Sequence, residues 1–173
     1  TGDATDFGNL TSGAYGTSAL SDATYGLFVL GRTGSSTYVN TIDYVTIATT
    51  GNASDFGDAT VSLGYRACCS DTTRGIIAGG ASGGTSTYVN VIEYVTIAST
   101  GNATDFGDLS DDVSQMAAVS DGTYGVISHG LNDSYQIVNT LDTITIQTTG
   151  NATDFGDLSV ARSRLTGASG NAS

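Results

Sequence analysis

The clearest pattern in the chain is a short segment with apolar side chains on both of its alternating faces. In residues 91–97, Val95 and Ile97 fall on one face of an extended chain, and Ile92 and Tyr94 fall on the other. The segment is rich in β-branched and aromatic residues and is bounded by turn-forming residues. This pattern predicts a β-strand that is covered on both sides.

The same kinds of segment recur along the chain. A second apolar segment opens with Ser-Asp, a turn former, and closes at Gly, which predicts another buried strand. A third kind is small and mixed in polarity. The first kind covers residues 41–48, 91–98 and 140–147; the second covers 21–31, 70–80 and 120–130; the third covers 11–20, 60–69, 110–119 and 159–168.

A nine-residue stretch, Thr-Gly-Asn-Ala-Thr-Asp-Phe-Gly-Asp in its clearest copy at 100–108, sets the period of the chain. Its four copies place Phe7, Phe56, Phe106 and Phe155 at intervals of 49, 50 and 49 residues. A near-constant period of this length indicates one supersecondary unit in tandem. We therefore expect a single repeat domain over 1–173, with repeats at 1–49, 50–99 and 100–148 and a partial repeat at 149–173.

These segments predict an all-β fold with four short strands per repeat. The 24 Gly residues and the lack of helical periodicity argue against long helices. Four strands in about 50 residues are typical of one antiparallel blade of a β-propeller. A β-solenoid or another stack of sheets is the alternative, although solenoid coils are usually shorter.

Several of these features resemble a kelch-type repeat. They are the apolar strand closed by Gly79-Gly80, the variable loop after it, the turn at 100–102, the aromatic Phe106, and an Arg in the following segment, such as Arg66. The resemblance covers nearly the whole chain and implies kelch-like propeller blades. The regular sequence of the nine-residue stretch is also similar to tandem repeats in structural or tail-fibre-like proteins of marine bacteriophages. That resemblance implies a virion appendage or an extracellular adhesin.

The order of the strands bears on completeness. The chain is expected to supply 14 strands, since the nine-residue stretch and the mixed segment recur once more after three full units. Two identical copies would then lack two strands at each junction of a ring. We therefore expect this chain to be part of a larger propeller, whose further blades lie on the same or another polypeptide.

Charge and composition exclude some function classes. Five Arg residues, no Lys and 17 carboxylates give a net charge of −12. Such a chain repels phosphate backbones, so we expect no nucleic-acid partner. No apolar run approaches the length of a membrane span.

Most chemically suggestive motifs have a structural interpretation. Asp-Phe-Gly occurs in protein kinases, but four periodic copies indicate that Phe fills space between sheets, Gly permits a tight backbone and Asp caps a turn. Carboxylates such as Asp105 and Asp108 are ligands that Ca²⁺ accepts, but their spacing does not match the known calcium loop. Asn52, Asn102 and Asn151 lie in Asn-Ala-Ser/Thr sequons, where turn formation is favoured over glycosylation.

The residues that suggest catalysis are few. His129 is the single histidine, and no nucleophile motif accompanies it. Cys68 and Cys69 are adjacent, so a disulfide between them would be strained, and we expect two buried thiols. We therefore predict no enzyme activity, no catalytic or metal-binding residue and no cofactor. A propeller-type hydrolase or lyase and a calcium-stabilised adhesin are the alternatives.

The candidate binding residues are three tyrosines in the most variable loops. Tyr38 and Tyr88 occupy matching positions, and Tyr135 lies nearby in the third repeat. Variable loops on a rigid scaffold commonly carry binding sites, and Tyr can stack on a sugar or a protein surface. The alternative is that these rings cover the edges of the sheets. The predicted role is a structural and binding module that contacts protein or glycan, with further copies or blades as partners, in a virion or extracellular setting.

Overall fold

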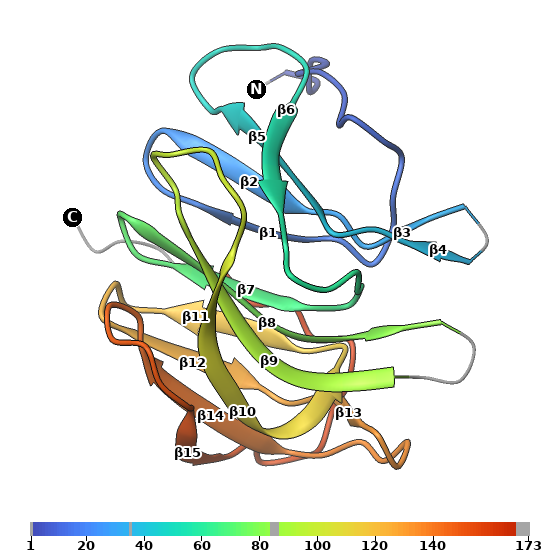
Figure 1. Ribbon diagram of the computed structural model, residues 1–173, viewed down its shortest axis with the longest axis vertical. Helices are drawn as coiled ribbons and strands as arrows, with labels where there is room; N and C mark the ends of the chain where they lie inside the picture. The colour runs from blue at the N-terminus through green and yellow to red at the C-terminus, as the bar shows by residue number, and fades with distance from the viewer. Residues whose placement is uncertain (1, 35, 84–86, 169–173) are drawn as a thin grey trace.

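The computed structural model describes residues 2–34, 36–83 and 87–168, and this part of the chain contains strands, turns and coil but no helix. Its strands form four antiparallel sheets, which confirms the all-β prediction (Figure 1). No helix of the described part is long and apolar enough to cross a membrane.

Three of the sheets repeat one design, with the strand order of the first sheet matched in the other two. Sheet 1 contains β1 (Ser18–Ser21), β2 (Tyr25–Val29), β5 (Thr41–Thr46) and β6 (Ser54–Asp58). Sheet 2 contains β7 (Ala67–Ser70), β8 (Arg74–Ser82), β9 (Thr87–Thr96), β10 (Thr104–Ser114) and β13 (Leu131–Asn132). Sheet 3 contains β11 (Ala117–Ser120), β12 (Tyr124–Ser128), β14 (Thr140–Thr145) and β15 (Thr153–Asp157). The small fourth sheet pairs β3 (Arg32–Thr33) with β4 (Thr37–Tyr38).

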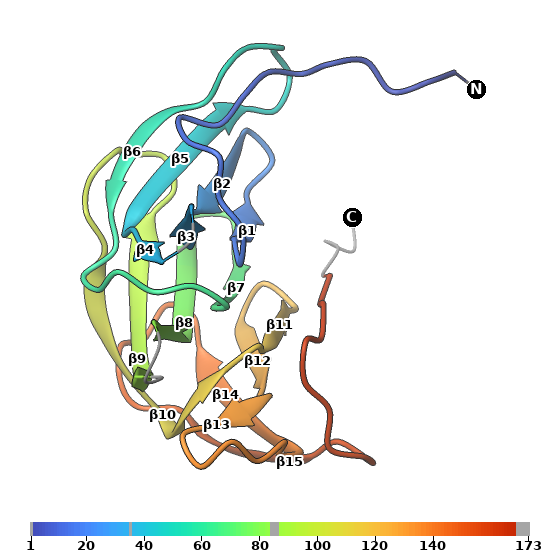
Figure 2. The same cartoon turned by 90° about the vertical axis from the view of Figure 1, so that its right-hand side faces the viewer.

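Each large sheet takes three strands from one repeat and a fourth from the next, and sheet 2 takes the short β13 from the next repeat as well. In sheet 1, β1, β2 and β5 belong to the first repeat, whereas β6 contains the Asp-Phe-Gly of the second. Figure 2 shows β1, β7 and β11 following one another along one side of the stack, with β6 and β10 along the opposite side. Sheet 2 is curled, because β10 pairs with β9 along most of its length and with β13 at its end.

The Ser-Asp turns behave as predicted. Asp71 Oδ1 accepts hydrogen bonds from the backbone N–H groups of Thr73 and Arg74, each at 2.7 Å. Asp22 and Asp121 make the equivalent pairs of bonds in the other two repeats. These bonds close the hairpin between the first two strands of each sheet.

In the three Asp-Phe-Gly copies that lie in strands, the Phe is at a β-bulge. In sheet 1, Asp43 pairs with Asp55 and Ile42 with Gly57, so Phe56 is the extra residue. The same skip occurs at Phe106 and Phe155. A bulge re-aims the side chain of the extra residue. Phe56 and Phe106 are consequently buried in the apolar layers between sheets.

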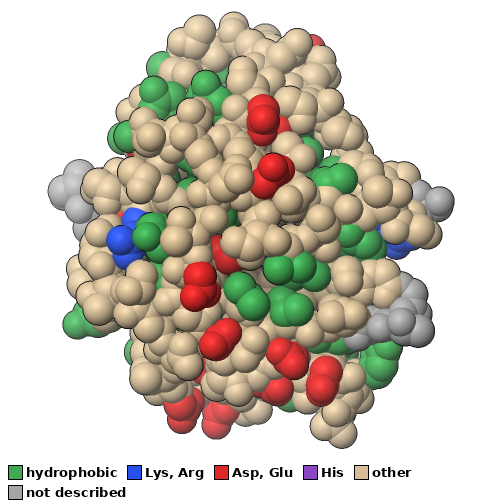
Figure 3. Space-filling model, viewed as in Figure 1, with side chains coloured by type: hydrophobic (Ala, Val, Ile, Leu, Met, Phe, Trp, Pro, Cys, Tyr) green, Lys and Arg blue, Asp and Glu red, His purple; other side chains and the backbone are tan. Residues whose placement is uncertain are grey.

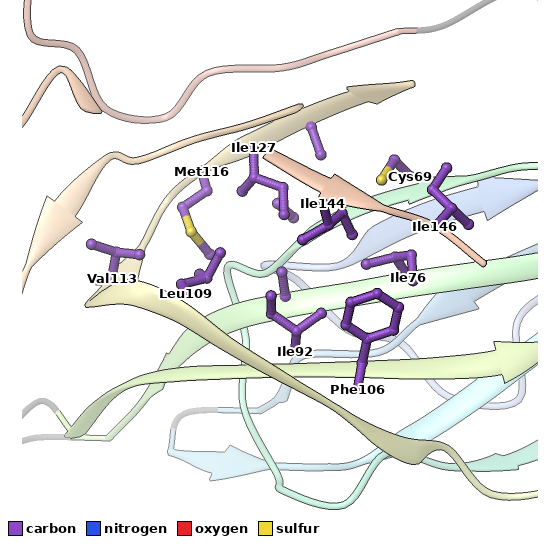
Figure 4. Packing of buried hydrophobic residues seen from close by; sticks show 13 residues of the cluster. Cys69, Ile76, Ile92, Phe106, Leu109, Val113, Met116, Ile127, Ile144 and Ile146 are labelled. Carbon is purple, nitrogen blue, oxygen red and sulfur yellow. The ribbon is translucent and has the colours of Figure 1, made fainter. Parts of the chain in front are cut away.

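Two apolar cores hold the three sheets together. The core between sheets 1 and 2 contains Phe56 and Leu27 from one side and Val95 and Ile97 from the other. The core between sheets 2 and 3 places Ile92 and Phe106 against Ile144 (Figure 4). Both faces of β9 are therefore covered, as the pattern in residues 91–97 predicted.

Two expected strands are absent, so the expectation of 14 strands in four-stranded units was wrong in detail. Residues 2–10 and 159–168 are not regular strands. A strand needs a hydrogen-bonding neighbour at its edge, and neither segment has a complete one within this chain. In the mixed segments at 11–20, 60–69 and 110–119 the extended chain is interrupted just before β1, β7 and β11, because Gly16, Tyr65 and Gln115 adopt left-handed φ values of 66°, 61° and 58°.

Candidate binding surface

The hairpins that follow the second strand of each sheet lie on one side of the molecule. Figure 1 shows β3 and β4, the ends of β8 and β9, and β13 projecting on that same side. We call this the hairpin side. It carries the three tyrosines predicted as binding residues: Tyr38 in β4, Tyr88 in β9 and Tyr135 between β13 and β14.

The structure brings Tyr88 and Tyr135 together. Their ring centroids are 5.9 Å apart and the rings are nearly perpendicular, at 85°. Tyr88 is buried, whereas Tyr135 is 63% exposed and adopts a left-handed backbone with φ 58°. The buried Tyr88 ring thus packs edge-to-face against Tyr135 and restricts the position of the exposed ring. For Tyr88 itself, burial matches the alternative that the ring covers a sheet edge.

Tyr38 belongs to a second aromatic group, built around Arg32. The Arg32 guanidinium carbon lies 5.2 Å from the centroid of the Tyr15 ring and 5.8 Å from that of Tyr38. Arg32 Nε is buried and has no hydrogen-bond partner. The Tyr15 hydroxyl donates to the Gly34 carbonyl oxygen at 3.0 Å, which holds this 44% exposed ring in place. The guanidinium is thus within cation–π distance of both rings.

Sequence reasoning missed Tyr15 and Arg32, although a signal was present. Tyr15 aligns with Gly64 and Ser114 of the next repeats, and Arg32 aligns with Ala81 and Leu131. Each is a large residue where the repeat otherwise carries a small or apolar one. A residue type that differs from its counterparts in the other repeats is one that the fold of the repeat does not require.

A buried carboxylate recurs in every repeat, in the third strand of each sheet. Asp43, Glu93 and Asp142 are fully buried. Each accepts a backbone and a hydroxyl hydrogen bond from the Thr or Ser that follows the nine-residue stretch. These donors are Thr11 for Asp43, Thr60 for Glu93 and Ser110 for Asp142. The repeated bond ties the mixed segment to the sheet.

Two of these carboxylates have an additional cationic or titratable partner. Arg66 Nη1 donates to Glu93 Oε2 at 2.5 Å, and both side chains are buried. His129 Nε2 lies 2.9 Å from Asp142 Oδ2. Burial acts to raise the pKa of Asp142, but hydrogen bonds from His129 and Ser110 outweigh it and hold the pKa below its usual range.

The group around His129 does not have the geometry of a hydrolytic triad. The Ser110 hydroxyl bonds Asp142 rather than the imidazole, so the carboxylate stands between the other two groups. A nucleophilic serine needs its hydroxyl against the base. His129 is itself 1% exposed, and its bond to Asp142 stabilises the core.

The repeated acidic stretch lies on the face shown in Figure 3, where acidic side chains follow β6 and β10; these are Asp, since the single Glu, Glu93, is fully buried. Burial and the neighbouring carboxylates of Asp133 and Asp111 raise the pKa of Asp112. Among the described residues there is no group of three His, Cys, Asp or Glu side chains that could hold a metal ion.

In the Asp-Phe-Gly copies at 6–8, 55–57 and 154–156, the Asp accepts a hydrogen bond from the Gly N–H two residues later, as the turn interpretation predicted.

The Asn of the nine-residue stretch joins successive repeats. Asn102 Oδ1 accepts the backbone N–H of Asp58 at 3.0 Å, and Asn151 Oδ1 accepts that of Asp108 at 3.1 Å. Its neighbours bond in the same direction, since Gly101 N–H donates to the Phe56 carbonyl at 2.8 Å. The regular spacing of these Asn residues along the chain therefore has a structural cause, since each one bonds the backbone of the preceding repeat.

The two cysteines are free thiols, as predicted. Cys69 is buried, whereas Cys68 is only half-buried, which corrects the expectation that both are fully enclosed. Burial raises the pKa of each thiol to about 12. Neither thiol is therefore a nucleophile at neutral pH.

The sequence matches no protein-family model, and no curated protein matches it either.

Proposed function

We propose that this chain is a non-enzymatic binding scaffold whose hairpin side binds a neutral glycan. The observation that carries the proposal is the arrangement of exposed rings, with Tyr135 braced by Tyr88 and Tyr15 braced by Arg32. Both exposed rings are held by neighbouring aromatic or cationic groups, so little side-chain entropy is lost when a sugar stacks on them.

Charge favours a neutral ligand. The chain carries a net charge of −12, and the carboxylates of Asp133 and Asp111 contribute to the raised pKa of Asp112. A polyanionic glycan would meet the same repulsion. Arg32 supplies N–H donors for sugar hydroxyls beside two rings that suit the apolar face of a pyranose.

The proposed architecture is a kelch-like β-propeller built from the three repeated sheets. Their matching strand order, their stacking and the transfer of one strand between repeats support it. The proposed setting is a virion appendage or another extracellular surface, on the strength of the resemblance to phage tail-fibre-like repeats. A repeated scaffold whose buried carboxylates are already hydrogen-bonded supports a binding role over a hydrolase or lyase.

The test is titration calorimetry of the chain with cellohexaose as the neutral probe and a galacturonate hexasaccharide as the acidic one. We expect binding of cellohexaose and weaker binding of the acidic sugar. Tyr15→Ala and Tyr135→Ala should each reduce affinity by up to about tenfold, the value of one aromatic contact. Tyr124→Ala is the matched control, because Tyr124 is 52% exposed away from these hairpins.

Arg32→Lys should also weaken binding, because Lys keeps the charge but has no planar guanidinium to contact the two rings and donate to sugar hydroxyls. Arg162→Gln, at an exposed Arg outside the hairpins, is the control for this variant. Absence of cellohexaose binding contradicts the glycan proposal. So does binding that survives the loss of both exposed tyrosines.

A further inference from the structure

The two internal junctions between sheets use the same contact. The first strand of one sheet carries a side chain that lies on a Gly in the second strand of the next sheet. These contacts are Leu20 in β1 on Gly75, and Cys69 in β7 on Gly125. A Cβ on Gly75 would lie 2.7 Å from Leu20 Cδ1, and one on Gly125 would lie 2.9 Å from Cys69 Sγ. Each Gly is therefore a socket that the preceding sheet fills.

A backbone contact accompanies this one at the outer strands. Gly101 N–H donates to the Phe56 carbonyl and Ala103 N–H to the Asp58 carbonyl, both at 2.8 Å. At the next junction, Gly150 and Ala152 bond Phe106 and Asp108 with the same lengths. Side-chain socket and backbone contact together define one interface that occurs twice in the chain.

The side-chain parts of this interface recur, largely exposed, at the two ends of the stack, while at sheet 1 the backbone contact is made by residues 7–9 of the same chain. Sheet 3 presents Val119 in the position of Leu20 and Cys69, and Phe155 in the position of Phe56 and Phe106. Phe155 is 60% exposed, against 4% for Phe56 and 3% for Phe106. Among the described residues, nothing covers the Phe155 ring as the next sheet covers the other two.

Sheet 1 presents the complementary half. Gly26 occupies the socket position, and a Cβ there would meet only Val45 and Ile47 of its own sheet, at 3.5 and 3.7 Å. Ile47 is 46% exposed, whereas the equivalent Ile97 is 1% exposed. The surrounding groove has a volume of about 610 Å³ and is lined largely by apolar side chains such as Leu27 and Phe28.

The coil segments at the two ends occupy positions that a neighbouring sheet would take. Residues 2–10 lie where the outer strand of a preceding sheet belongs, since Gly51 N–H donates to the Phe7 carbonyl at 2.8 Å. Residues 159–168 lie where the inner strand of a following sheet belongs, since Arg164 N–H donates to the Gln115 carbonyl at 2.9 Å. Neither segment is a strand, whereas β15 and β1, their counterparts at the opposite ends, are.

We propose that a second copy of this chain docks head to tail, so that sheet 3 of one copy packs on sheet 1 of the next. Val119 then fills the Gly26 socket, and Phe155 is covered as Phe56 and Phe106 are. The Gly51-Asn52-Ala53 turn bonds β15 of the neighbour in place of residues 7–9. Residues 2–10 of one copy and 159–168 of the other are displaced, which removes the mismatch in strand order that a simple ring of copies presents.

The occupant is a second copy because the chain itself supplies both halves of the interface and uses them twice internally. The contact is heterologous, since two different surfaces meet, and such contacts build rings or open filaments. Both surfaces are mostly uncharged, with Asp121 as the charged residue beside the Phe155 surface.

Sedimentation velocity over a range of protein concentrations tests the proposal. The wild-type chain should form oligomers that grow with concentration. Phe155→Asp removes one surface and Ile47→Asp removes the other, so each variant alone should stay monomeric. Both side chains are exposed, and circular dichroism of each variant checks that the fold persists.

The decisive measurement mixes the two variants in equal amounts. The Ile47→Asp copy keeps an intact sheet 3 surface and the Phe155→Asp copy keeps an intact sheet 1 surface, so the mixture should form a dimer with one copy of each. Deleting residues 1–9 from the wild-type chain should strengthen association, because a competitor for the sheet 1 surface is gone. A wild-type chain that is monomeric at every concentration overturns the proposal, and so does a mixture that remains monomeric.

Discussion

Gly75 offers the sharpest single test of how the sheets pack. A Cβ at this position would lie 2.7 and 2.8 Å from the two Cδ atoms of Leu20 and 3.2 Å from Val95 Cγ2. Gly75 lies in β8 and is not among the residues with positive φ, so Ala fits the backbone. The two shortest contacts are with Leu20 of sheet 1, so the packing between sheets 1 and 2 is the main obstacle to the substitution.

The magnitude follows from two opposing terms. Overpacking a core usually costs about 1–3 kcal/mol, and replacing a strand Gly by Ala returns about 0.5–1 kcal/mol. Gly75→Ala should therefore lower the free energy of unfolding by about 0.5–2 kcal/mol. For a chain of this size, each kcal/mol lowers Tm by about 2–4 °C.

Gly26→Ala is the matched control, because Gly26 has the same place in the first repeat. Its added Cβ would make ordinary contacts at 3.5 and 3.7 Å with Val45 and Ile47. Without the overpacking term, this variant should be as stable as wild type or more stable by about 0.5–1 kcal/mol.

The assay is urea denaturation followed by far-ultraviolet circular dichroism and tyrosine fluorescence, at a concentration where the chain is monomeric. Gly75→Ala should cost less stability in a Leu20→Ala background than in the wild-type chain, since the two positions are in contact and their effects couple. Equal effects of Gly26→Ala and Gly75→Ala would refute the packing argument. Full stability of Gly75→Ala would refute it as well.

Three further predictions concern the buried polar groups. Arg66→Ala should lower the free energy of unfolding by about 3–5 kcal/mol, because Glu93 is left buried without its cation; the double variant Arg66→Met, Glu93→Gln should recover most of this in urea denaturation. The pKa of Asp142 is lowered in the folded state, so its stabilisation is complete above its unfolded pKa and is lost as pH falls through the folded one. The difference in unfolding free energy between wild type and Asp142→Asn should thus shrink from pH 7 to acid, and a constant difference would contradict this. Because the pKa of the Cys68 and Cys69 thiols is about 12, a disulfide reagent at pH 8 should modify them far more slowly in the folded than in the urea-unfolded chain.

The fold could be predicted from the sequence where the signal is local. The alternation in residues 91–97, the Ser-Asp turns and the spacing of the Phe residues each depend on a few neighbouring positions, and the structure confirms the strands and turns they indicate. Pairing of a sheet with the Asp-Phe-Gly of the following repeat depends on contacts between distant segments, which periodicity does not encode.

The candidate site was less accessible from the sequence for the same reason. Tyr135 was found because exposed loops attract binding residues, but its support by Tyr88 depends on two sheets meeting. The contact of Arg32 with Tyr15 crosses 17 positions of the chain. The buried ion pair of Glu93 with Arg66 was not predicted either, because Arg66 lies 27 residues away in a different segment.

The transfer of one strand from each repeat to the preceding sheet has a consequence for how such a chain changes in length during evolution. Because the order of segments is the same in every repeat, duplication or deletion of a window of one repeat length would keep the order β1-β2-β5-β6, or its equivalent, in the remaining sheets, wherever the cuts fall. Recombination within the gene therefore needs no favoured breakpoint. The number of sheets can vary between descendants while each interface between them stays the same.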